Sequence, residues 1–315
     1  MRHNRTLCLF AALALFASPV LAQELPQEGP VPTTALINAE SKNPVQLDPN
    51  ALNLQVNGRE TPIKSLQSAG SGNYEVAILI DDGLRSSFGQ QLRELSSFIN
   101  SLPRNGKILV GYMQNGTVRS SGHFTSDHQE IANDLRVTMG VPGTSASPYF
   151  CLSDFVKKWP SQQPAARFVL LITNGVDPYN GSTSITNQDS PYVNSAQNDA
   201  LRAGVAVYSI YFPNAGFRGG RGSFSGQSYL QQVGDATGGM LFNNGSIPPV
   251  SIAPFLDQFS RSINTSYELG FMAVANNKGD RLTRIKVKSN QQGVKIRAPQ
   301  AVRPGLSLSP ASSGQ

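Results

Sequence analysis

Charged residues and cysteines are both scarce in this chain of 315 residues. Only 15% of the residues are charged and only two are cysteines, whereas about 25% charge is usual in soluble domains. Two cysteines exclude a disulfide scaffold, and without a C-x-x-C pair they indicate neither a zinc site nor a redox site. The length suits either one α/β domain with extensions or about two domains.

The common catalytic and nucleotide-binding motifs are also missing from the sequence. It has no Gly-x-Ser-x-Gly pentad, no Walker A loop and no Gly-x-Gly-x-x-Gly after a strand. A nucleophilic pair of Cys151 with His123 or His128 is an alternative, but we expect both histidines to be solvated on the surface. These absences favour a protein that is not an enzyme.

Only one stretch is apolar enough to approach a membrane span, and it lies at the N-terminus. Arg2 and Arg5 precede an apolar segment from residue 7 to 16, and small residues follow just before Gln23. This is the pattern of a cleavable signal peptide over residues 1–22. A retained anchor would need about 20 apolar residues, and Pro19 interrupts the run. The sequence therefore predicts a secreted or periplasmic protein with no transmembrane segment after cleavage.

Cys151 is the only cysteine that remains after residues 1–22 are removed. Free cysteine is among the most frequently buried residue types. We therefore expect a buried thiol, and pairing between two chains stays an alternative.

The net charge of +6 does not indicate nucleic-acid binding. Most of the excess comes from residues 281–303, where Lys and Arg alternate with apolar residues. Alternation of this kind is typical of a strand with one solvated face.

Apolar runs alternate with segments of helical periodicity through the middle of the chain. Two runs, at residues 76–80 and 168–172, are continuously apolar, and a third at 205–211 is interrupted only by Ser209, as in strands that are buried on both faces. This alternation predicts an α/β fold with a doubly wound, mainly parallel sheet of the Rossmann type and flanking β-hairpin segments.

The same patterns predict the following division of the chain. Six segments are expected, namely a signal peptide at 1–22, a disordered Pro-rich leader at 23–47, an N-terminal β segment at 48–72, an α/β domain at 73–265, a C-terminal β-hairpin segment at 266–303 and a disordered tail at 304–315.

Several motifs taken in order resemble a known family. Ile-Asp-Asp-Gly-Leu-Arg at 80–85 and Ile-Thr-Asn-Gly at 172–175 each follow a predicted central strand. Tyr-Glu-Leu-Gly-Phe at 267–271 and Arg-Ile-Lys-Val-Lys at 284–288 come later, and Leu-Gln-Val-Asn-Gly-Arg at 54–59 leads. Over about residues 48–303 the chain resembles the von Willebrand factor type A (VWA) domain, in its secreted bacterial group.

The resemblance implies a metal-ion-dependent adhesion site, but a degenerate one. The family uses Asp-x-Ser-x-Ser after the first strand, a Thr from a later loop and an Asp after a later strand, which are hard oxygen ligands for a divalent cation. Asp81 matches the first Asp and Thr144 the Thr. Gly83 and Arg85 stand where the two serines would be, and Asn174 stands where the later Asp would be.

These departures predict that the site works without a metal. A guanidinium beside a divalent cation would cost several kcal/mol in repulsion, since two unit charges 4 Å apart interact by about 4 kcal/mol at an effective dielectric of 20. We expect Arg85 to replace the cation and pair with Asp81, with Asn174 as a neutral partner. The alternative is that Arg85 turns away and that Asp82 or Asp177 helps to bind magnesium, manganese or calcium.

The resemblance and the missing catalytic motifs together favour an exported binding or adhesion module. Its partner would be a protein or polysaccharide of the envelope or the extracellular space, met by the loops at the carboxyl ends of the strands. Arg218 and Arg221 lie in a Gly-rich loop that is a second candidate, for an anionic partner.

The sequence leaves two alternative functions open. One is an enzyme of unrecognised type that uses Asp81, Asp82, Thr144 and Ser145. The other is a structural component of a cell-envelope assembly that pairs through the C-terminal hairpin.

Overall fold

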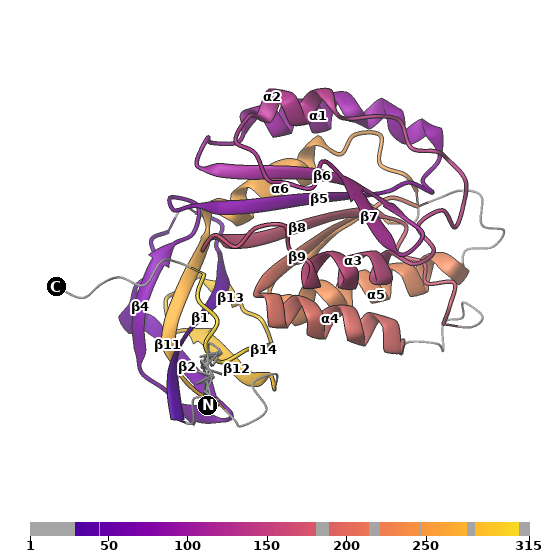
Figure 1. Ribbon diagram of the computed structural model, residues 1–315. Helices are drawn as coiled ribbons and strands as arrows, with labels where there is room; N and C mark the ends of the chain where they lie inside the picture. Colours follow the sequence, from indigo (N-terminus) through magenta and orange to yellow (C-terminus); the bar gives the residue numbers. More distant parts are fainter. Residues whose placement is uncertain are drawn as a thin grey trace, which may run out of the picture.

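The computed structural model describes residues 29–43, 45–180, 189–213, 221–245, 247–275 and 281–308. These residues form an α/β unit with a central sheet and, beside it, two antiparallel sheets (Figure 1). Among them, no helix is long and apolar enough to cross a bilayer.

The central sheet has six strands in the order β10-β9-β8-β5-β6-β7. Five strands are parallel and β7 is antiparallel at one edge. Every residue of the central strand β5 is buried, because helices cover both faces, and this accounts for its continuous apolar run. The strands are β5 (Tyr74–Asp81), β6 (Gly106–Gln114), β7 (Thr117–Ser120), β8 (Ala166–Thr173), β9 (Val205–Tyr211) and β10 (Leu241–Phe242).

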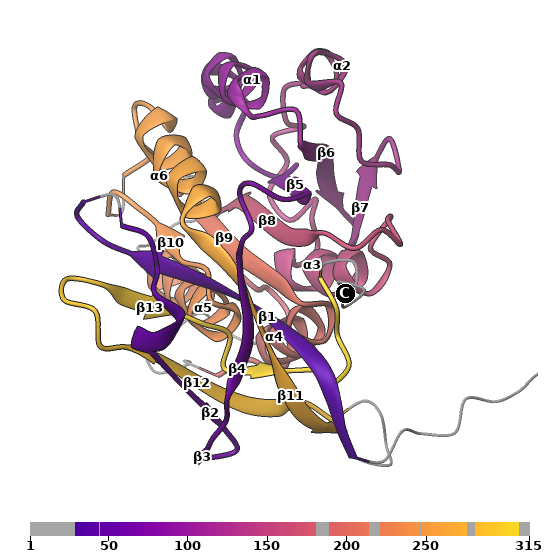
Figure 2. The same ribbon diagram turned by 90° about the vertical axis from the view of Figure 1, so that its left-hand side faces the viewer.

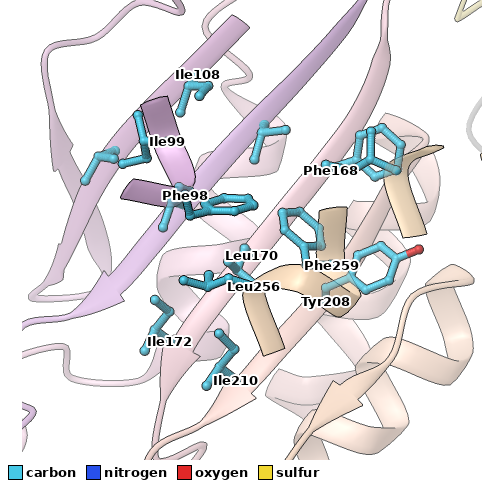
Figure 3. Close-up of a cluster of buried hydrophobic side chains, with 14 of the residues drawn as sticks. Phe98, Ile99, Ile108, Phe168, Leu170, Ile172, Tyr208, Ile210, Leu256 and Phe259 are labelled. Carbon is cyan, nitrogen blue, oxygen red and sulfur yellow. The ribbon is translucent and has the colours of Figure 1, made fainter. Parts of the chain in front are cut away.

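Helices lie on both faces of this sheet, which makes it doubly wound. On one face are α1 (Leu92–Ser101), α2 (His128–Asn133) and α6 (Ala253–Asn264), and on the other are α3 (Pro148–Lys157), α4 (Pro191–Ala203) and α5 (Arg221–Thr237) (Figure 1). Figure 3 shows the first face, where Phe98 of α1 and Phe259 of α6 pack over Leu170 of β8. The predicted α/β class is confirmed by this strand order and layering.

Two four-stranded antiparallel sheets form a sandwich beside the α/β unit (Figure 2). One sheet has the order β13-β1-β11-β4 and the other β14-β12-β2-β3, and apolar side chains of both share one core. The strands are β1 (Gly29–Glu40), β2 (Leu52–Val56), β3 (Arg59–Glu60), β4 (Ile63–Ser68), β11 (Ser266–Ala275), β12 (Thr283–Ser289), β13 (Lys295–Arg297) and β14 (Ala301–Val302). β2 and β3 form a hairpin at Asn57-Gly58, with both turn residues at positive φ.

The prediction of a disordered leader over 23–47 is wrong for the residues that the structure describes. Residues 29–40 form β1, which pairs with β11 along ten positions. Ala35, Ile37 and Ala39 enter the sandwich core while Leu36 faces the α/β core. Two of the prolines that suggested disorder, Pro30 and Pro32, occupy the start of this strand, so the composition alone gave the wrong prediction.

Two predictions at the C-terminal end also need correction. The strands expected to form a hairpin, β11 and β12, lie in different sheets, because β11 is held between β1 and β4 while β12 pairs with β2 and β14. Residues 304–308, which were predicted to belong to a disordered tail, are packed against the rest of the protein. Leu306 and Leu308 are buried in the α/β core, and the Leu306 carbonyl accepts a bond from the Thr34 N–H at 2.8 Å.

Candidate binding site at the carboxyl end of the sheet

Asp81, the last residue of β5, is held by donors on both carboxylate oxygens. The Thr173 hydroxyl at the end of β8 donates to Oδ2 at 2.7 Å, and the Gly83 N–H donates to Oδ1 at 3.0 Å. Burial raises the pKa of Asp81, and hydrogen bonds from Thr173, Gly83 and Ser145 oppose that rise. The carboxyl is therefore an internal hydrogen-bonded group that is only 3% exposed.

Asp82, the next residue, forms a bidentate ion pair with Arg136. Nη1 lies 2.8 Å from Oδ1 and Nη2 lies 2.8 Å from Oδ2. Gln114 and the Met139 N–H also donate to this carboxylate. Burial would raise the pKa of Asp82, but these hydrogen bonds outweigh burial and lower it. Asp82 is thus a buried carboxylate whose charge is matched within the protein.

The segment 134–147, which we call the strap, joins α2 on one face of the sheet to α3 on the other. It is fastened to the residues that follow β5 at several points. The Gly140 N–H donates to the Asp82 carbonyl at 3.2 Å, and the Thr138 hydroxyl donates to the Leu84 carbonyl at 2.7 Å. Further along, Thr144 and Ser145 accept bonds from the Asn115 and Gly116 N–H groups at 2.8 and 2.9 Å. The strap therefore crosses the carboxyl end of the sheet as a fixed element.

The strap lies directly against Gly83. A Cβ at this position would come within 3.0 Å of the Val141 carbonyl oxygen, 3.2 Å of Asp81 Oδ1 and 3.4 Å of the Gly143 nitrogen. Contacts of 3.0–3.4 Å are tighter than most contacts of a Cβ, so a side chain at this position would require the strap to move by a few tenths of an ångström. The position at which the VWA motif has its first serine is therefore covered by backbone of the strap.

Arg85 does not form the predicted pair with Asp81. Its side chain is exposed, whereas Asp81 is buried and its oxygens accept from Thr173 and Gly83. The chain turns outward after Leu84 and enters a 3-10 helix at Ser86, which directs Arg85 to solvent. In the described part of the chain, the ion pair at this end of β5 is made by Asp82 and Arg136.

The other predicted site residues near the strand ends form hydrogen bonds within or next to their own loops. Thr144 donates to the Val141 carbonyl at 2.6 Å inside the strap, and Thr173 occupies the position beside Asp81 that Thr144 was expected to fill. The Asn174 side chain accepts from the Val176 N–H at 2.9 Å, which caps the turn after β8. Asp177 is buried and accepts from Ser190 at 3.0 Å.

In the predicted second loop, Arg218 and the side chain of Arg221 lie outside the described residues.

The donors at this site do not fit the divalent cation that the family resemblance implies. Both oxygens of Asp81 already accept hydrogen bonds, Gly83 supplies no oxygen ligand, and Asp82 is neutralised by Arg136. Within the described ranges, no group of three His, Cys, Asp or Glu residues is close enough together to hold a metal. A hard cation requires several oxygen ligands with negative charge, and this arrangement offers none that is unpaired.

The strap presents apolar side chains to solvent. Val137, Met139 and Val141 are 50%, 61% and 58% exposed, while Thr138 between them points inward. Tyr179, in the loop after β8, is 56% exposed and its ring contacts Phe150 at the start of α3. Exposed apolar side chains that gather on one face are typical of interaction surfaces.

Sequence reasoning missed the two side chains that organise the site. Arg136 is separated from Asp82 by 54 positions and belongs to no motif, so only the fold reveals the pair. Thr173 belongs to the Ile-Thr-Asn-Gly motif. As a polar residue directly after the apolar run 168–172, it could have been identified as a site residue from the sequence.

Cys151 is a buried free thiol, as expected from the sequence. Its Sγ donates to the Ser145 carbonyl at 3.3 Å. Burial raises the pKa of this thiol to about 12, so it is protonated and unreactive at neutral pH.

No protein-family model and no curated protein sequence match this chain. Among solved structures, an aerotolerance-related membrane protein of Bacteroides fragilis matches 61% of this chain and 99% of its own length, at 15% identity and a TM-score of 0.40. A von Willebrand factor type A protein of Catenulispora acidiphila matches 88% of this chain and 74% of its own, at 11% identity and a TM-score of 0.42. The ArnB paralog VWA2 of Sulfolobus acidocaldarius matches 87% and 76%, at 9% identity and a TM-score of 0.39. The similar structures thus include VWA proteins, the family that the sequence motifs resemble.

Proposed function

We propose that this protein is an exported binding module that recognises a protein partner through the exposed face of the strap, without a metal and without catalysis. The observation that carries the proposal is the strap itself. Its backbone lies against Gly83, where the adhesion motif would have a serine, and its Arg136 forms a bidentate pair with Asp82.

The chemistry of the strap face favours a protein over a polysaccharide. Val137, Met139 and Val141 offer flexible and branched aliphatic surface, and Met in particular adapts to apolar partners. Arg85 adds an exposed cation after β5, which favours a partner with an acidic group near its apolar contact. Aliphatic contacts surrounded by charge are typical of protein interfaces.

The enzyme alternative has less support from the same geometry. Asp81 lies beneath the strap with both oxygens engaged, and Asp82 is held by Arg136, Gln114 and a backbone N–H. A general acid or base must reach a substrate within hydrogen-bonding distance. Neither carboxyl is placed to do so beneath the strap.

The experiment is a quantitative capture assay with the immobilised protein and the proteins that its own cells export. A captured partner is then purified and its affinity is measured for the wild type and for Met139→Glu. We expect the substitution to weaken binding at least tenfold, because it places a charge in the apolar contact. We also expect no loss of binding in EDTA.

The matched control is Val274→Glu, which changes a similarly exposed apolar residue, 60% exposed, at the end of β11 in the sandwich. Equal loss of affinity in both variants, or loss of binding in EDTA, would contradict the proposal. N-terminal sequencing of the exported chain tests the predicted cleavage before Gln23.

A further inference from the structure

A polar cavity of about 460 Å³ lies at the opposite end of the central sheet from the strap. It opens where α3 and α4 end and where β8 begins. The charged residues that line it are Lys157, Arg167, Asp199, Arg202 and Arg303. The cavity is therefore formed by elements that are distant in sequence and that the fold brings together.

Among the described residues that line this cavity, cations outnumber acids. Asp199 is the only acid among them, and it is shared by Lys157 at 3.6 Å and Arg202 at 3.1 Å. Within the described ranges, neither Arg167 nor Arg303 forms an ion pair. These two guanidiniums therefore bring positive charge to the cavity without an ion-pair contact to a described carboxylate, although the charge of Glu75 acts on Arg167 from behind the lining.

Arg167 is also incompletely satisfied as a hydrogen-bond donor. Its Nη1 and Nη2 reach the carbonyl oxygens of Ala203 and Ser161 at 3.3 and 3.4 Å, and its Nε is buried with no partner among the described residues. The nearby Glu75 accepts from the Trp159 indole N–H at 2.6 Å. Burial lowers the pKa of Arg167 and the charge of Arg303 lowers it further, while Glu75 opposes both effects.

We infer that this cavity is a binding site for a dianionic phosphate group, either free or carried by a small organic molecule. Among the described residues, four cations in the lining face two carboxylates, Asp199 in the lining and Glu75 behind it, so that formal positive charges exceed negative ones by about two. A phosphate monoester carries close to two negative charges at neutral pH. Guanidinium groups bind phosphate through paired N–H donors.

The size of the cavity agrees with such a ligand. Pockets for small molecules usually measure about 300–1,000 Å³, so 460 Å³ can hold a phosphate with a glycerol- or sugar-sized group attached. Because this site and the strap lie at opposite ends of the sheet, the inference is independent of the proposed function.

Trp159 supplies a direct probe, because it lines the cavity and is the only tryptophan of the chain. Its ring lies 5.4 Å from the Arg167 guanidinium. The experiment titrates inorganic phosphate at constant ionic strength and follows tryptophan fluorescence and the melting temperature. We expect a saturable change in fluorescence and a rise in melting temperature over the same concentrations.

The variants test the named side chains. Arg303→Gln changes an exposed residue, and we expect it to raise the Kd for phosphate about tenfold, as for the loss of one charged hydrogen bond. Lys157→Gln provides a second test that does not depend on the fold around residue 303. Arg93→Gln, an exposed arginine of α1 on the other face of the sheet, is the control and should leave the Kd unchanged.

Other ligands test the chemical class. Glycerol 3-phosphate that binds more tightly than phosphate would identify an organic phosphate as the ligand, and equal affinity would identify free phosphate. The inference would be overturned by a linear, non-saturable response or by tighter binding of malonate than of phosphate. It would also be overturned if Arg303→Gln and Lys157→Gln had the same Kd for phosphate as the wild type.

Discussion

Arg136 and Asp82 are 54 positions apart in the sequence and form a bidentate ion pair, with both N–O distances at 2.8 Å. The pair joins the strap to the end of the central strand, and the Arg136 guanidinium also lies 3.8 Å from the centre of the Tyr112 ring. A fixed cation from the protein thus neutralises a carboxylate at the edge where the VWA family resemblance implies a metal ion.

Removing this cation should destabilise the protein. Arg136→Met keeps the apolar stem and leaves the Asp82 carboxylate buried without its charged partner. We expect a loss of about 1–3 kcal/mol in the free energy of unfolding, which is less than for a fully buried pair because the Arg136 side chain is 42% exposed. Denaturant unfolding measures the effect, with Arg119→Met on the edge strand β7 as the control. Equal stability of the two variants would show that the pair does not fasten the strap.

Gly83→Ser restores one residue of the adhesion motif and should nevertheless be harmful. The new Cβ would meet the Val141 carbonyl at 3.0 Å, so the strap must shift. Overpacking of this kind costs about 1–3 kcal/mol, and proteolysis should cut the strap faster. Gly72→Ser is the control, because its Cβ would have its nearest contact at 3.7 Å. Unchanged stability and proteolysis in Gly83→Ser would contradict the close contact between the strap and Gly83.

Asp81→Asn should change how stability depends on pH. Burial raises the pKa of Asp81 above its ordinary 3.8 in the folded protein. As the pH rises above about 4, the unfolded chain loses this proton while the folded chain retains it, so wild-type stability falls until the pH passes the folded pKa. The neutral amide removes that dependence, and Asp81→Asn should gain stability relative to the wild type between pH 4 and 7. Urea unfolding at several pH values measures the difference, and a difference that stays flat or declines with pH would refute the raised pKa.

Cys151 should resist thiol reagents in the folded protein. The side chain is buried and burial raises its pKa to about 12, so little thiolate exists at pH 8. For a chain without residues 1–22, Ellman's reagent should detect no thiol in native buffer and one thiol per chain in denaturant. Rapid reaction in native buffer would show that Cys151 is accessible.

The fold was largely predictable from the sequence because its signals are local. Apolar runs in the sequence identified β5, β8 and β9. The sequence did not predict that residues 29–40 form strand β1. This Pro-rich segment is extended because it pairs with β11, which is distant in the sequence.

The candidate site was less predictable because its contacts are between distant segments. Asp81 and Gly83 were found from their motif, but the partner of Asp81 is Thr173 from another strand. Arg85 and Arg136 are both arginines near this edge, and the sequence gives no sign of which one turns inward. The course of the strap decides this, and the strap has no periodicity of its own.

Calorimetric titration with magnesium, manganese and calcium tests the central claim most directly. If the strap and the Asp82–Arg136 pair take the place of a metal at this end of the sheet, none of the three ions should show saturable binding to the wild-type protein. Micromolar binding that disappears in Asp81→Ala would contradict the account and would restore a metal-dependent adhesion site.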